Sequence, residues 1–284
     1  MALTLETRDL TIRFGGHVAV DAVSCAFRPG TLTAIVGPNG AGKTTYFNLI
    51  SGQLPASAGR VLLDGVDITG ESASARTHRG LGRAFQLTQL FPGLSVLENV
   101  RLAVQSRRRE GLRLWSVWLD QRETLAQARE LVEQVQLGDR VDALASSLPH
   151  GDQRKLEVAM LMALEPSVYM FDEPTAGMSV DDVPVVLDLI RRLKARRDKT
   201  ILLVEHKMDV VRELADRIVV LHNGQCVADG LPAEVIASPV VQQAYLGGAA
   251  TPPPPPPQAY GRDEPPVRTI PAVRDRSMQG GSHG

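Results

Sequence analysis

The stretch that decides the fold is Gly37-Pro38-Asn39-Gly40-Ala41-Gly42-Lys43-Thr44-Thr45. It matches the pattern G-x-x-x-x-G-K-[ST], a loop that surrounds nucleotide phosphates when it joins a strand to a helix. An apolar run, 31–36, precedes it and a helical pattern, 45–50, follows it. Curled main-chain N–H groups and the positive end of the helix would bind the phosphates. Lys43 is expected to contact the β- and γ-phosphates, and the Thr44 hydroxyl to ligate Mg²⁺.

Length and composition narrow the class of protein. The chain has 284 residues, of which 43% are apolar, so one large or two small domains can bury a core. A net charge of −1 gives no reason to expect nucleic-acid binding. The sequence shows neither a long apolar span nor a basic-then-apolar signal segment at its start. Cys25 and Cys226 belong to no C-x-x-C motif, which suits a reducing cytosol and leaves a disulfide between them open.

The residues on either side of the loop predict an antiparallel sheet. Short alternating runs fill 3–35, and 59–68 reads as a hairpin with Asp64-Gly65 at its turn. Phe14 precedes the first core strand, where it could stack on an adenine ring or simply belong to the core.

The middle of the chain, 71–164, is predicted to be mostly helical. The segment 122–137 has an apolar stripe at helical spacing. Before it, three arginines (107–109) and Trp115 and Trp118 suggest contact with a membrane surface or a membrane partner. The plainer interpretation is a solvated turn followed by a core-facing helix.

An alternation of strands and helices returns after residue 165. Apolar strands are predicted at 168–171 and 200–204, a helix at 181–193 and a closing hairpin at 217–228. Strands separated by helices imply a mostly parallel core sheet. The end of the chain contains six consecutive prolines, 252–257, and few core-forming residues, so it is predicted to be a disordered tail.

Four polar residues are candidates for the chemistry, and three of them follow predicted strands. Asp172 is assigned to Mg²⁺ and Glu173 to the attacking water, because nucleotide hydrolysis needs a carboxylate for each task. His206 follows the next apolar strand, at the edge where ligands gather in parallel sheets, and is expected to contact the γ-phosphate. Gln86 could reach the metal or the attacking water, although glutamine is usually a plain surface residue.

A second glycine-containing turn, 148–154, precedes an amphipathic helix predicted at 155–163. A helix that opens in this way is another anion site. Since the chain already has one phosphate loop, the second site suggests a phosphate bound from a neighbouring subunit. Its candidate residues are Leu148, His150, Gly151 and Asp152.

These features occur in the order found in ATP-binding-cassette (ABC) ATPases, which the chain resembles from about residue 4 to residue 247. The resemblance implies a RecA-like P-loop NTPase core in the α/β class, with an antiparallel β subdomain and an α-helical subdomain that carries the signature Leu148–Asp152. It implies an ATPase domain at 1–248, with the helical part at about 87–164, and a tail at 249–284. It also implies ATP and Mg²⁺ as ligands and Gln86 and His206 as the Q-loop and switch residues. Two subunits would face head to tail, each signature capping the ATP on the other's phosphate loop.

Two positions depart from the family pattern. Pro149 replaces a serine whose hydroxyl would contact the γ-phosphate, and Ser179 stands where many relatives carry aspartate. Within the family, the chain is most similar to the larger-type ATPase of branched-chain amino-acid importers, through the pieces 14–16, 83–86, 90–92, 96–100, 153–157 and 244–247. That resemblance implies a second ATPase subunit, membrane permeases, an extracytoplasmic binding protein and a place on the cytoplasmic face of the inner membrane. It does not identify the transported molecule.

Two further functions stay open. An ATPase of a lipid or lipopolysaccharide exporter would share the phosphate loop and carboxylates, but the Leu-Pro-His-Gly-Asp signature argues against it. A non-transport ABC protein acting on DNA or ribosomes would be expected to show a coiled coil, a second cassette or a basic face, and the sequence indicates none of these.

Overall fold

The computed structural model describes residues 3–84, 90–108 and 117–246. Gln86 and the expected tail lie outside the described residues. So does part of the segment with the arginines and tryptophans, and the side chains of 108–121 are not described. The strands are β1 (Leu5–Phe14), β2 (His17–Phe27), β3 (Leu32–Val36), β4 (Ala58–Leu63), β5 (Val66–Asp67), β6 (Leu81–Ala84), β7 (Val168–Asp172), β8 (Thr200–Val204), β9 (Arg217–His222) and β10 (Gln225–Gly230). The helices are α1 (Lys43–Ser51), α2 (Ala73–His78), α3 (Val96–Arg108), α4 (Val117–Gln134), α5 (His150–Leu164), α6 (Val183–Ala195), α7 (Met208–Leu214), α8 (Pro232–Ala237) and α9 (Pro239–Leu246), with short 3₁₀ turns at Gly138–Arg140 and Ala145–Ser147.

The strands form two sheets, as the sequence predicted. An antiparallel sheet has the order β2-β1-β4-β5, and a larger sheet has the order β10-β9-β3-β8-β7-β6. In the larger sheet β3, β6, β7, β8 and β9 are parallel neighbours, and only β10 runs antiparallel. The turn at Asp64-Gly65 joins β4 to β5, and both residues have positive φ, which suits a tight hairpin.

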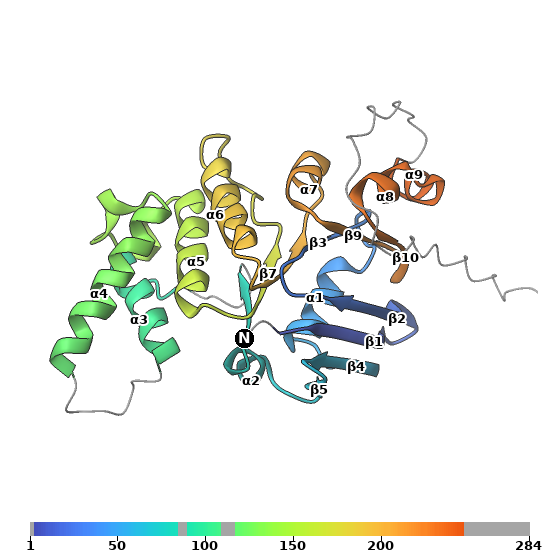
Figure 1. Cartoon of the computed structure of the whole chain (residues 1–284), viewed down its shortest axis with the longest axis horizontal. Helices are drawn as coiled ribbons and strands as arrows, with labels where there is room; N and C mark the ends of the chain where they lie inside the picture. The colour runs from blue at the N-terminus through green and yellow to red at the C-terminus, as the bar shows by residue number, and fades with distance from the viewer. Residues whose placement is uncertain (1–2, 85–89, 109–116, 247–284) are drawn as a thin grey trace, which may run out of the picture.

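Successive residues of the core strands face opposite sides of the larger sheet. On β8, Leu202 and Val204 pack with α1 and the antiparallel sheet, whereas Ile201 and Leu203 pack with the helices of the other face. Because both faces are covered, these strands read as continuous apolar runs. Helix α1 therefore lies between the two sheets, and α3, α4 and α5 stand at the far end of the molecule from β1 and β2 (Figure 1).

The described part of 71–164 is mostly helical, as predicted, and its strand β6 forms an edge of the larger sheet. One sequence prediction needs correction. The helix predicted at 155–163 begins earlier, at His150, so that Gly151 and Asp152 lie in its first turn. None of the described helices combines the length and hydropathy that a membrane span requires.

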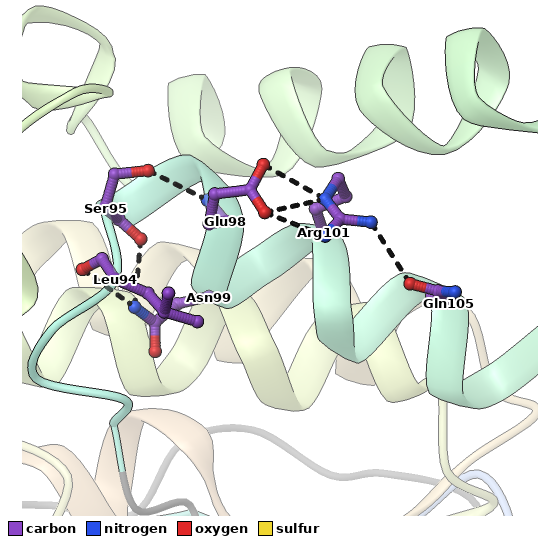
Figure 2. Close-up of polar contacts among 6 residues, drawn as sticks. All are labelled: Leu94, Ser95, Glu98, Asn99, Arg101 and Gln105. Carbon is purple, nitrogen blue, oxygen red and sulfur yellow. Dashed lines mark hydrogen bonds and ion pairs between the residues drawn. The ribbon is translucent and has the colours of Figure 1, made fainter. Parts of the chain in front are cut away.

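A buried amide fixes the entry into the helical part of the chain. Asn99 on α3 has no exposed surface, and its Nδ2 donates to the carbonyl oxygens of Leu94 and Ser95 at 3.3 and 2.9 Å (Figure 2). It also exchanges hydrogen bonds with the main chain of Phe91, whose N–H donates to Oδ1 at 2.8 Å. Asn99 thus shapes the turn that connects the core sheet to α3.

Candidate functional site

The phosphate loop lies between β3 and α1 and is packed tightly against main-chain atoms. A Cβ on Gly37 would collide with the carbonyl oxygen of Leu221, and one on Gly42, where φ is 95°, would collide with that of Ala19. Larger residues are excluded at both positions by this close approach. The N–H of Gly224 donates to the carbonyl oxygen of Ala41 at 3.1 Å, so the β9–β10 turn supports the loop from outside.

Lys43 is the first residue of α1, and its side chain folds back over the loop. Its Nζ donates to the carbonyl oxygens of Gly37 and Pro38 at 2.7 and 2.9 Å. Burial lowers the pKa of Lys43, and the nearby charges of Glu173 and Asp172 offset this in part. The ammonium group is therefore held against the main chain of the loop. Thr44 follows it and is exposed.

The carboxylates and the histidine lie at the same edge of the sheet. Asp172 ends β7, Glu173 follows it, and His206 comes two residues after the end of β8. Because β3, β8 and β7 are parallel neighbours, their carboxyl ends place these residues beside the phosphate loop. The Nδ1 atom of His206 lies 3.8 Å from Oε1 of Glu173, and both side chains are about half exposed.

Glu173 has an unusual backbone conformation. Its φ is 49°, and its N–H donates to the carbonyl oxygen of Val204 on the neighbouring strand at 2.9 Å. A non-glycine residue in this region costs about 1–3 kcal/mol and needs surrounding structure to hold it. The conformation turns the chain sharply after β7, so that Glu173 leaves the sheet while Asp172 stays almost buried in it.

Two residues of this region, Glu205 and Arg83, were not predicted from the sequence. Glu205 is completely buried and accepts hydrogen bonds from the Thr175 hydroxyl at 2.7 Å and from the His206 N–H at 2.9 Å. It thereby fixes the turn that carries His206. Arg83 is buried beside Asp172 and forms an ion pair with it at 2.7 Å. The apolar runs before Asp172 and Glu205 give similar patterns, but nothing in the sequence marked Glu205 as more than a neighbour of His206.

The signature residues lie apart from these groups, at the start of α5. Pro149 is the N-cap residue and provides no side-chain cap. Asp152 pairs with Lys155 at 3.2 Å and with Arg140 at 3.0 Å. Leu148 is buried, whereas His150 is exposed.

The remaining candidates are placed as follows. Phe14, at the end of β1, is 50% exposed, so the interpretation as a core residue is wrong and its ring is free to stack on a ligand. Ser179 donates from its hydroxyl to Asp182 at 2.7 Å, just before α6. Both cysteines are buried and free, so the structure has no disulfide between them.

Oxygen ligands suit the metal expected here. Thr44 is exposed, and the hydrogen bond from Arg83 to Asp172 goes to the Oδ2 atom. A hydroxyl and a carboxylate oxygen are hard ligands of the kind that Mg²⁺ binds, directly or through its waters. The residues present therefore fit the metal.

Comparison with known proteins agrees with the sequence patterns. The profile of the ABC transporter family matches residues 20–176, and that of a branched-chain amino acid ATP-binding cassette transporter family matches residues 225–251. The high-affinity branched-chain amino acid transport ATP-binding protein LivG of Escherichia coli K12 is 36% identical over 248 residues, which cover 86% of this chain and 97% of LivG. BraF of Pseudomonas aeruginosa is 36% identical over 249 residues, with the same coverage.

Solved structures show the same fold. A nucleotide-free ATP-binding cassette from an ABC transporter superposes with a TM-score of 0.72 at 29% identity, covering 86% of this chain and 98% of that one. The ADP conformation of an ATP-binding cassette of an ABC transporter gives a TM-score of 0.71 at 29% identity. The match covers 87% of this chain and 100% of that one. The predicted fold class is confirmed: the chain belongs to the ABC transporter family and is one of its nucleotide-binding, ATP-hydrolysing cassettes.

Proposed function

We propose that this chain is the ATP-hydrolysing subunit of an importer for branched-chain amino acids or related small polar organic molecules. The observation that carries the proposal is the pair of matches to LivG and BraF, each spanning 97% of the relative's length. The branched-chain family profile at 225–251 supports the same assignment, since it covers β10 and the helices after it, outside the nucleotide site.

In this proposal the phosphate loop, 37–45, holds the nucleotide. Its main-chain N–H groups and Lys43 bind the phosphates, and Phe14 stacks on the adenine ring. Thr44, Asp172 and Gln86 hold Mg²⁺, which neutralises charge on the β- and γ-phosphates when it is bound. The half-exposed ring of Phe14 and the oxygen atoms of Thr44 and Asp172 support these roles.

Hydrolysis is assigned to the residues that leave the sheet edge. Glu173 orients the attacking water and accepts its proton, and His206 and Gln86 bind the γ-phosphate or that water. The 3.8 Å between His206 Nδ1 and Glu173 Oε1 supports this pairing, because a single phosphate and its attacking water would contact both side chains.

The subunit is proposed to act in a pair. The signature residues Leu148, His150, Gly151 and Asp152 would cap ATP on the phosphate loop of a second ABC ATPase, through the main-chain N–H groups of the uncapped start of α5. The pair would sit on the cytoplasmic face of the cell membrane, bound to permease subunits that receive substrate from an extracytoplasmic binding protein. We assign the ATPase domain to 1–248, with its helical part at about 87–164, and the proline-rich residues 249–284 to a separate tail.

The test is to isolate the complex that the chain forms in its own cell. The tagged chain, and the same chain with Glu173→Gln, are purified from detergent-solubilised membranes and reconstituted with co-purifying permeases. We expect ATP-dependent uptake of leucine, isoleucine or valine by the wild type alone, in the presence of the binding protein. Lipid efflux instead of uptake would favour an exporter, and co-purification with ribosomes or DNA without permeases would contradict the proposal.

A further inference from the structure

Arg83 is a charged residue whose side chain has no exposed surface. Its guanidinium group is enclosed by polar partners and by one aromatic ring. It donates to Oδ2 of Asp172 at 2.7 Å, to Asn48 Oδ1 at 2.7 Å, to Ser51 Oγ at 2.9 Å and to Gln53 Oε1 at 3.1 Å, and it lies 5.5 Å from the centre of the Phe47 ring. A buried cation is costly unless it is paired and hydrogen-bonded, so this set of partners is what allows Arg83 to be there.

Two elements that meet at the nucleotide site supply several of the partners of Arg83. Asn48 and Ser51 lie on α1, the helix that begins with Lys43 and Thr44, and Asp172 ends β7. Arg83 therefore connects the carboxylate of Asp172 to the helix that carries Thr44. A rigid, planar guanidinium suits this task, because α1 holds its Nη1 atom while its Nη2 atom donates to Asp172.

Arg76 offers a matched comparison within the same chain. It is also buried, with 2% of its surface exposed, and it also holds α1. Its Nη1 donates to the carbonyl oxygens of Leu49 and Ile50, both at 2.7 Å, and its Nη2 donates to that of Thr69 at 2.7 Å. These acceptors are main-chain atoms, two at the end of α1 and one after β5, whereas Arg83 binds a carboxylate at the nucleotide site.

We propose that Arg83 is a positioning residue of the metal–nucleotide site, which holds Asp172 in the orientation that Mg²⁺ requires relative to Thr44. The proposal rests on the proposed function, in which Thr44 and Asp172 hold the metal. Arg83 occupies one carboxylate oxygen and so leaves the other to Mg²⁺ or to a water bound to it. Residues that orient metal-binding carboxylates typically change metal affinity by about 10–100-fold when they are replaced.

The test measures how Mg²⁺ tightens nucleotide binding, without relying on turnover. A fluorescent ATP analogue is titrated into the purified full chain, first in EDTA and then across a range of Mg²⁺ concentrations. We expect Arg83→Lys to raise the Mg²⁺ concentration at half-effect by about tenfold, while affinity in EDTA stays near the wild-type value. Arg76→Lys should lower the melting temperature to a similar degree and leave that Mg²⁺ concentration unchanged.

Further variants separate the outcomes. Asp172→Asn should raise the Mg²⁺ requirement at least as much as Arg83→Lys, and Asn48→Ala, which removes one anchor of Arg83, should raise it by a smaller factor if Arg83→Lys fails to fold. A wild-type Mg²⁺ requirement in Arg83→Lys, or in Asn48→Ala if Arg83→Lys fails to fold, overturns the inference. If Asp172→Asn still raises the Mg²⁺ requirement in that case, the proposed function stands. An equal shift in Arg76→Lys also overturns the inference, since loosening of α1 would then explain the effect. If Asp172→Asn has no effect, the assignment of the metal to Asp172 falls, and this inference falls with it.

Discussion

Lys155 joins the signature helix to the helix that follows Ser179, and its removal makes a sharp test of that connection. Its Nζ atom pairs with Asp152 at 3.2 Å and with Asp182 at the start of α6, and only 7% of its side chain is exposed. A Cβ on Gly151 would lie 2.8 Å from Oδ2 of Asp182, so the two helices meet closely here. The variant Lys155→Met keeps most of the side-chain volume and removes the charge.

The expected loss can be worked from the contacts. Removing one partner of a buried ion pair costs about 3–5 kcal/mol when the other charge is left alone. Asp152 and Asp182 are 13% and 27% exposed, and they keep Arg140 and the Ser179 hydroxyl as partners. The low end of the range therefore applies, and Lys155→Met should lower the free energy of unfolding by about 3 kcal/mol. Asp182→Asn, which removes one of the two pairs, should cost about half as much.

The assay is urea unfolding at neutral pH, followed by circular dichroism, for both single variants and the double variant. Because the residues are in direct contact, the two losses should fall short of additivity by about 1–2 kcal/mol. Affinity for nucleotide at the phosphate loop should be retained in all of them. A loss below about 0.5 kcal/mol, or simple additivity, would show that the pair does not hold α5 against α6.

Three other predictions follow from the same structure. Lys43→Ala should weaken ATP binding by at least about tenfold, since it removes a cation held over the phosphate loop, and unchanged affinity in a fluorescence titration would contradict the assignment. Asn99→Ala removes four hydrogen bonds around the turn at Phe91. It should lower the free energy of unfolding, measured in urea, by about 2–4 kcal/mol, and the amides of that turn should exchange hydrogen faster. Hydrogen bonds from Lys155, and next from Ser179, hold the pKa of Asp182 below its ordinary value. The stability that Asp182 contributes should therefore be complete above about pH 4 and be lost as the pH falls through its folded pKa. If the wild type stays more stable than Asp182→Asn at lower pH, this prediction is refuted.

Much of the site could be predicted because its chemistry follows from strand ends. Asp172 and Glu173 follow one apolar run and His206 follows another, and in a parallel sheet such residues gather at one edge. The phosphate loop was recognisable because its glycines cannot be replaced by larger residues. A Cβ on Gly37 or Gly42 would collide with a nearby carbonyl oxygen. The assigned roles of these residues are still predictions.

Other features depend on contacts that a local pattern does not contain. The strand β6 has four residues, including a glycine and a buried arginine, so its pattern resembles a loop. Arg83 reads as a surface residue until Asp172, 89 positions later, is seen beside it. The signature helix begins at His150, five residues before the predicted start at Lys155. The apolar pattern missed this first turn because a proline stands at the N-cap and a glycine lies in the turn.

The central claim is that Glu173 activates water against an ATP held on the phosphate loop. The direct measurement is the nucleotide found in the reconstituted complex after incubation with radiolabelled ATP and Mg²⁺, for the wild type, Glu173→Gln and a control, Glu234→Gln, at an exposed position on α8. We predict that Glu173→Gln retains unhydrolysed ATP and turns over at least about 100-fold more slowly, while the control behaves as wild type. Release of ADP by Glu173→Gln at the wild-type rate would contradict the claim.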